Sequence, residues 1–147
     1  MMDDELELAN EPQPSETDVR IVSEGLLAFN VAYIGREPQD APVTLFLRDT
    51  EGRVVGGLMG GWRWGWLYTN KLWVQEQYRG QGAGSRLLRA VETQALAAGC
   101  TDAVLDTFSF QASPFYERHG YKIYATLEGF PPGYRLHFLH KRLAAGL

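Results

Sequence analysis

The sequence predicts an α/β fold of the α+β type, with a mixed, mostly antiparallel sheet of about six to seven strands and flanking helices. Three apolar runs joined by short turns follow one another between residues 43 and 74, which is typical of an antiparallel meander. A strand, a glycine-rich loop, an amphipathic helix and a further strand then follow, which indicates a βαβ unit and one parallel strand pair. Proline and glycine at 131–133 separate two last strands.

The length of 147 residues fits one domain, expected over residues 1–147. The net charge of -4 argues against broad electrostatic binding to nucleic acid or to an anionic membrane, so neither partner is expected. Cys100 is the single cysteine and the histidines lack metal-ligand spacing, so we expect no disulfide and no metal. The acidic N-terminus lacks a signal-peptide layout and no long apolar run occurs, which favours a cytoplasmic protein.

The first helix and strands are predicted from helix-capping residues and from the spacing of apolar residues. Residues 5–10 could form a short strand. Ser15 begins an acidic variant of the capping box, apolar residues then recur at helical spacing, and Gly35 fits the position after the helix. Strands are expected over 43–48, 53–62 and 67–74.

The remaining elements are expected from the same signals. An amphipathic helix begins at Gly82 and ends at Gly99. The later elements are a strand at 103–105, a short helix at 113–119, and strands at 121–126 and 134–140. If a strand continued through Trp62, Trp64 and Trp66, these side chains would share one side, where packing is favoured over an acceptor pocket.

The most specific feature is the glycine-rich loop at residues 77–85, between a strand and a helix. Glycines at alternate positions let backbone N–H groups point into one concavity at the helix N-terminus, where the helix dipole favours an anion. Arg79 adds a positive charge beside it. The loop therefore predicts a phosphate or pyrophosphate site. It fits neither the dinucleotide fingerprint, because Ser85 or Leu87 stands where the last glycine is needed, nor the P-loop, because no Gly-Lys-Ser or Gly-Lys-Thr occurs.

Two segments resemble a known family. Leu72-Trp73-Val74 followed by Arg79-Gly80-Gln81-Gly82-Ala83-Gly84 and Leu87-Leu88 looks like the acetyl-CoA-binding motif of the GNAT superfamily of N-acetyltransferases. Residues 112–121 resemble its later Ala-x-x-x-Tyr-x-x-x-Gly-aromatic signature. The resemblance is tight over about residues 67–125 and implies a GNAT-like fold in which the parallel strands splay apart at the CoA site.

The resemblance also implies a function: transfer of the acetyl group of acetyl-CoA, as cosubstrate, to a primary amine by direct attack through a tetrahedral intermediate. The acceptor would be a small molecule or a protein amine, and two copies of the chain could form a homodimer. Tyr116 matches the tyrosine that protonates the departing thiolate, and an N–H near Val74 would hold the oxyanion. The implied cofactor-binding residues are Leu72, Trp73 and Val74 for the pantetheine arm, and Arg79, Gly80, Gln81, Gly82, Ala83, Gly84 and Ser85 for the pyrophosphate.

The sequence departs from the family pattern in two places. Ser109 stands where many members have a cofactor-contacting Asn and is the remaining implied cofactor-binding residue, and residues 68–71 lack the carboxylate that often serves as general base. A water chain, Asp106 or Glu128 are alternatives for that base. These departures keep open a non-catalytic acyl-CoA-binding or sensing module on the same fold. Tyr68 and the segment 108–110 are candidates for the acceptor site.

Overall fold

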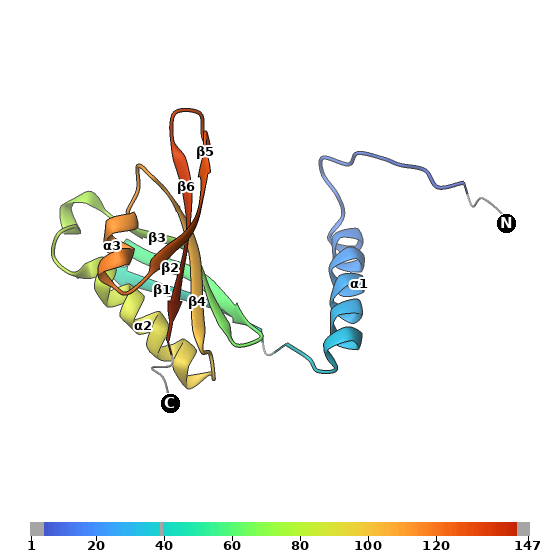
Figure 1. Ribbon diagram of the computed structural model, residues 1–147, viewed down its shortest axis with the longest axis horizontal. Coiled ribbons are helices and arrows are strands. Elements are labelled where there is room, and N and C mark those ends of the chain that lie inside the picture. Colours follow the sequence, from blue (N-terminus) through green and yellow to red (C-terminus); the bar gives the residue numbers. More distant parts are fainter. Residues whose placement is uncertain (1–4, 39, 144–147) are drawn as a thin grey trace. The chain divides into compact units, whose positions relative to one another are not determined.

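The structure is a computed structural model that describes residues 5–38 and 40–143, and the chain divides into two units at Pro38 (Figure 1). The N-terminal unit holds one helix. The C-terminal unit holds the sheet and the remaining helices. The elements are α1 (Glu16–Ile34), β1 (Ala41–Arg48), β2 (Val54–Arg63), β3 (Trp66–Val74), the 3-10 turn η1 (Glu76–Tyr78), α2 (Ala83–Ala97), β4 (Asp102–Phe108), α3 (Ser113–Arg118), β5 (Lys122–Glu128) and β6 (Arg135–Arg142). No helix within these described ranges has the length and hydropathy needed to cross a membrane.

Helix α1 begins and ends as its sequence predicts. The Asp18 N–H donates to the Ser15 hydroxyl oxygen at 3.1 Å, and Gly35 adopts a φ of 83° while its N–H bonds back to the Val31 carbonyl. The strand expected over residues 5–10 is wrong, because these residues have no regular structure. Their alternating leucines are exposed, and a strand without a hydrogen-bonded neighbour is not stable in water.

The sheet of the C-terminal unit has six strands in the order β1-β2-β3-β4-β6-β5. Strand β3 pairs with β4 in parallel, from Trp66 opposite Asp102 to Thr69 opposite Leu105, and the other neighbours are antiparallel. The predicted mixed, mostly antiparallel sheet with one parallel pair is confirmed. Helix α2 connects the two parallel strands, as a crossover connection must.

A β-bulge lies where this parallel pair ends. On β2, Gly60 pairs with Thr69 and Met59 pairs with Lys71, so Asn70 on β3 is left without a partner. A bulge bends its strand, and β3 separates from β4 beyond Thr69. Gly60 permits the close approach, because a Cβ atom there would lie 2.2 Å from the Tyr68 carbonyl oxygen.

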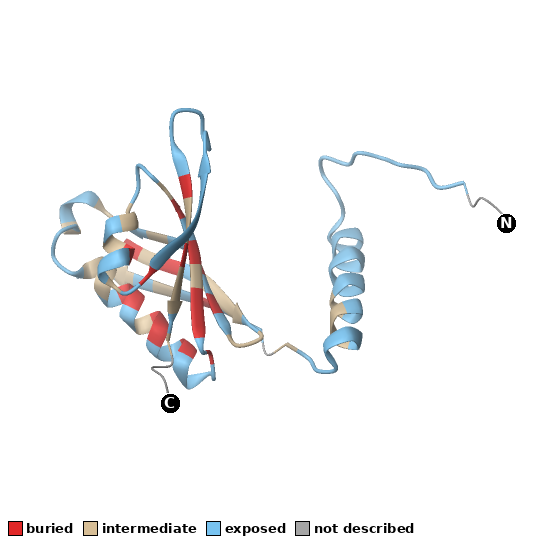
Figure 2. Ribbon diagram, viewed as in Figure 1, coloured by how far each residue is buried: buried red, intermediate tan, exposed pale blue. Residues whose placement is uncertain are grey.

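The core of the C-terminal unit lies between α2 and the sheet (Figure 2). Leu87, Leu88 and Val91 project from α2 at helical spacing and are buried against the strands. Glu92 is also buried on this helix, where it accepts hydrogen bonds from the Tyr121 hydroxyl at 2.9 Å and the Lys141 ammonium at 2.8 Å. A buried charged group needs such hydrogen-bond partners, and the bond with Lys141 connects α2 to strand β6.

The three tryptophans do not share a side. Strand β2 ends at Arg63, and Trp64 (φ 46°) and Gly65 form a turn, so the strand does not continue through all three. Trp62 packs against the core, whereas Trp66 stacks on the ring of His140 at 5.2 Å.

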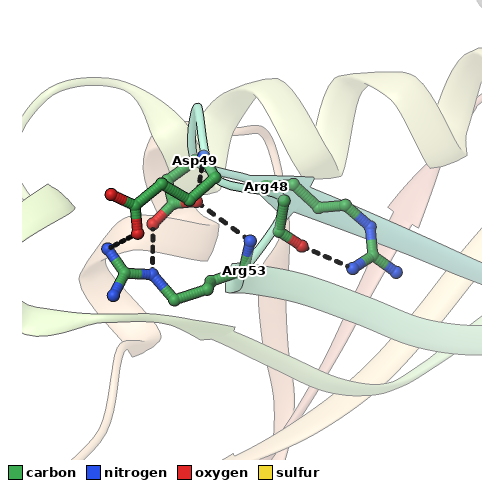
Figure 3. Close-up of polar contacts among 5 residues, drawn as sticks. Arg48, Asp49 and Arg53 are labelled. Carbon is green, nitrogen blue, oxygen red and sulfur yellow. Dashed lines mark hydrogen bonds and ion pairs between the residues drawn. The ribbon is translucent and has the colours of Figure 1, made fainter.

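The first hairpin is closed by a polar turn between β1 and β2 (Figure 3). One oxygen of the Asp49 carboxylate accepts from the backbone N–H groups of Glu51 and Arg53, both at 2.9 Å, and the other accepts from the Arg53 guanidinium. The hydrogen bonds from Arg53 lower the pKa of Asp49, with a smaller contribution from Glu51. The turn thus fixes the register of the hairpin that leads into β3.

Candidate active site

A cleft of about 850 Å³ opens where β3 and β4 separate. It is lined by the C-terminal half of β3, the glycine-rich loop, the first turn of α2, the end of β4 and helix α3. Almost all of the site residues predicted from the sequence line this one cleft: Leu72, Trp73, Val74, Arg79, Gly80, Gly82, Ala83, Gly84, Ser85 and Tyr116.

Two of the predicted cofactor-binding residues have side chains outside the lining of this cleft, although the Gln81 backbone belongs to the loop that borders it. Gln81 lines a second, smaller hollow on the other side of the loop, and its side-chain amide donates to the Gln77 carbonyl at 3.2 Å. Ser109 joins the end of β4 to β6, because its hydroxyl accepts from the Arg135 N–H at 3.0 Å and its own N–H donates to the Arg135 carbonyl. Its side chain therefore has a hydrogen-bonding role in the sheet.

The loop forms an anion cradle, by which we mean the backbone N–H groups of residues 80–85. None of these groups has a hydrogen-bond partner in the described part of the chain, and Gly82, the N-cap of α2, has no side chain to cap the helix. Gly80 and Gly82 adopt φ values of 73° and 83°, which aim successive amides toward one side. Free donors at a helix N-terminus fit a phosphate or pyrophosphate group.

Arginine side chains stand on both sides of the cradle. The Arg79 Nε donates to the Val74 carbonyl at 2.7 Å, which fastens the start of the loop to the end of β3. Arg118, at the end of α3, also lines the cleft. Arg79 thus holds the loop in shape as well as adding the positive charge that the sequence predicts, and Arg118 adds a second cation that the sequence did not indicate.

Ser85 has a partner that no sequence pattern indicated. Its hydroxyl lies 2.8 Å from His119 Nε2, a contact between the first turn of α2 and the end of α3. Burial is the main cause of a lowered His119 pKa; Lys141, Arg89 and Arg118 lower it too, and Glu92 opposes them. The imidazole is therefore neutral near pH 7. The two residues are 34 positions apart, so no local spacing connects them.

Tyr116 is buried on α3 with its side chain lining the cleft. Its hydroxyl has no hydrogen-bond partner among the described residues, so it is not held by the backbone. Burial raises the pKa of this phenol. The side chain therefore keeps its proton at neutral pH.

The end of β4 brings further side chains into the cleft. Asp106 lines it and accepts a hydrogen bond from the Tyr68 hydroxyl at 3.2 Å. Partial burial, and then the Asp106 charge and hydrogen bond, raise the pKa of Tyr68. Phe110 also lines the cleft. Glu128 is instead paired with Arg135 at 3.0 Å, outside the lining.

The fold and this cleft define a class of protein, the acyltransferases, and comparison with known proteins gives the family. The chain belongs to the acetyltransferase (GNAT) family, whose model matches residues 6–121. It is 42% identical over 93 residues to a blasticidin-S acetyltransferase of Streptomyces morookaense, covering 63% of this chain and 68% of that protein.

Two solved structures extend the likeness over nearly the whole chain. An acetyltransferase structure from Agrobacterium tumefaciens has a TM-score of 0.85 at 31% identity and covers 93% of this chain and 99% of its own. One from Bacillus cereus has a TM-score of 0.79 at 32% identity, with coverages of 91% and 97%. The expected GNAT-like fold is thus confirmed.

Proposed function

We propose that this protein transfers the acetyl group of acetyl-CoA to the amine of an acceptor. One observation carries the proposal. The same cleft contains the anion cradle of residues 80–85 and the part of β3 that is no longer paired with β4. The cradle suits the pyrophosphate of CoA. The backbone of Leu72, Trp73 and Val74 lies on the freed edge of β3, where an extended pantetheine arm can pair as an added strand.

The residues of the cleft then have distinct roles in the transfer. The attacking amine must be neutral, and the carbonyl oxygen of the thioester becomes an oxyanion that needs a preplaced donor. A backbone N–H near Val74 supplies that donor. As the C–S bond breaks, the Tyr116 hydroxyl donates its proton to the CoA thiolate, which leaves as a thiol, and the proton that the attacking nitrogen loses passes through water to restore the Tyr116 phenol. The neutral state of Tyr116 in its buried position supports this role.

The first acceptor to test is blasticidin S, because a relative 42% identical over 93 residues is named for it. The measurement is release of CoA thiol from acetyl-CoA with and without blasticidin S, together with calorimetric titration of acetyl-CoA. Binding of acetyl-CoA and thiol release that depends on an amine support the proposal. Failure to bind acetyl-CoA at high micromolar concentration would refute it.

A second candidate is a non-catalytic acyl-CoA-binding module. The observation that favours it is the stretch from Tyr68 to Lys71 on β3, which carries no carboxylate to activate an amine. This module would bind acetyl-CoA without releasing thiol with any member of a broad amine panel. Amine-dependent thiol release therefore decides between the two candidates.

A further inference from the structure

The cleft is lined by residues that belong to both faces of the sheet, and we call its part on the face away from α2 the second mouth. Leu67 and Leu105 point toward the core under α2 and are buried. Side chains alternate along a strand, so Tyr68 and Asp106, their next neighbours in sequence, point to the opposite face. Yet Asp106 lines the same cleft as the anion cradle. A ligand can therefore reach the gap from the face opposite the phosphate end.

The second mouth carries an unneutralised carboxylate. Asp106 is exposed and accepts its hydrogen bond from the phenol of Tyr68, a neutral group. Lys71 also lines the cleft, but no ion pair within the described residues joins it to Asp106. The Tyr68 bond holds one carboxylate oxygen, Oδ2, and leaves the other able to accept from a ligand cation.

Near this carboxylate lies a group of aromatic rings, which we call the aromatic shelf: the exposed rings of Phe110, Phe130 and Tyr134 and the half-buried ring of Phe108. Phe110 stacks on Phe108 at 5.3 Å with an interplanar angle of 6°, and Tyr134 meets it edge-on at 5.0 Å. Phe110 is nevertheless 56% exposed and lines the cleft. Exposed apolar surface that lines a cleft in this way is available to an apolar part of a ligand.

We propose that Asp106, held by Tyr68, binds a cationic group of the acceptor, while Phe110 packs against a ring or apolar part of the same molecule. The role as an acceptor site rests on the proposed acetyl transfer. The substrate class is then an acceptor that carries a cationic group besides the neutral amine that attacks, with an apolar or aromatic portion within a few bonds of that charge. Two interactions favour such a ligand: the carboxylate accepts a charge-assisted hydrogen bond from the cationic group, and the aromatic ring contacts the ligand beside it.

The test compares two probes of the same shape. Phenethylammonium carries the charge, whereas 2-phenylethanol is neutral, and the dissociation constant of each is measured by NMR titration with and without saturating CoA. We expect the cation to bind at least tenfold more tightly than the alcohol. Asp106→Asn keeps the shape and the Tyr68 contact, and it should abolish that preference. Glu117→Gln, an exposed carboxylate on α3 outside the cleft lining, is the matched control and should preserve it.

A second variant tests the aromatic half. Phe110→Ala should weaken both probes by a similar factor and leave the preference for the cation intact. The proposal is overturned if neither probe binds, if both bind equally, or if Asp106→Asn keeps the preference. The probes are also titrated without CoA, so the preference for the cation at Asp106 is measured even if the protein does not bind acetyl-CoA. That failure to bind would refute the proposed function separately.

Discussion

Replacement of Gly60 by Ala tests whether the bulge opens the cleft. The new Cβ atom would lie 2.2 Å from the Tyr68 carbonyl oxygen, whereas such atoms do not normally approach within 3.0 Å, so β2 and β3 must move apart by about 0.8 Å. Overpacking of this kind costs ~1–3 kcal/mol. The smaller backbone entropy of Ala in the unfolded chain offsets about 0.4–1 kcal/mol of that cost. We therefore expect a net loss of roughly 1–2 kcal/mol and a fall in Tm of about 2–8 °C for a protein of this size.

The assay is thermal unfolding followed by circular dichroism, with calorimetric titration of acetyl-CoA on the same samples. Because the bulge lies where β3 leaves β4, the variant should also bind acetyl-CoA more weakly than the parent protein. Gly25→Ala is the control, since a Cβ atom there meets nothing within 4 Å and Gly25 lies inside helix α1. A Gly60→Ala protein that melts within 1 °C of the parent and binds acetyl-CoA unchanged would refute the reasoning.

Two further predictions concern side chains of the cleft. Tyr116→Phe should lower kcat by about 10²–10⁴-fold, the usual contribution of a general acid, and leave acetyl-CoA affinity nearly unchanged. Steady-state kinetics measures kcat and calorimetry measures the affinity, and an unchanged kcat would contradict the prediction. The lowered pKa of His119 means that the unfolded chain binds its proton more readily than the folded one, so this residue should reduce stability as pH falls below about 6.5. His119→Gln should therefore lose less stability than the parent protein between pH 7.5 and pH 5.5 in urea unfolding, and equal losses would remove His119 as the cause.

Much of the fold could be predicted because its signals are local. The glycine-rich loop, the caps of α1 and the period of α2 each depend on residues within one or two turns. The cradle residues follow each other in the chain, so their grouping in one cleft is expected once the strand and helix on either side are recognised.

What the sequence could not show depends on pairing between distant strands. No local pattern shows which glycine of β2 lies against a neighbouring backbone, and only the register with β3 shows that Gly60 meets the Tyr68 backbone. Ser109 fills a family position but is bonded to Arg135, 26 residues later. The contact of Ser85 with His119 likewise joins two helices that no periodicity relates.

The lining of the cleft by both faces of the sheet has a kinetic consequence. If acetyl-CoA and the acceptor enter through opposite mouths, as we propose, neither blocks the other, and both can be bound at once for direct transfer of the acyl group. Initial-velocity plots at several fixed concentrations of acetyl-CoA should then intersect rather than run parallel. A single molecule that joins CoA to a phenethylamine through the gap would occupy both mouths at once, and its affinity would exceed either separate affinity by about 10²–10⁴-fold.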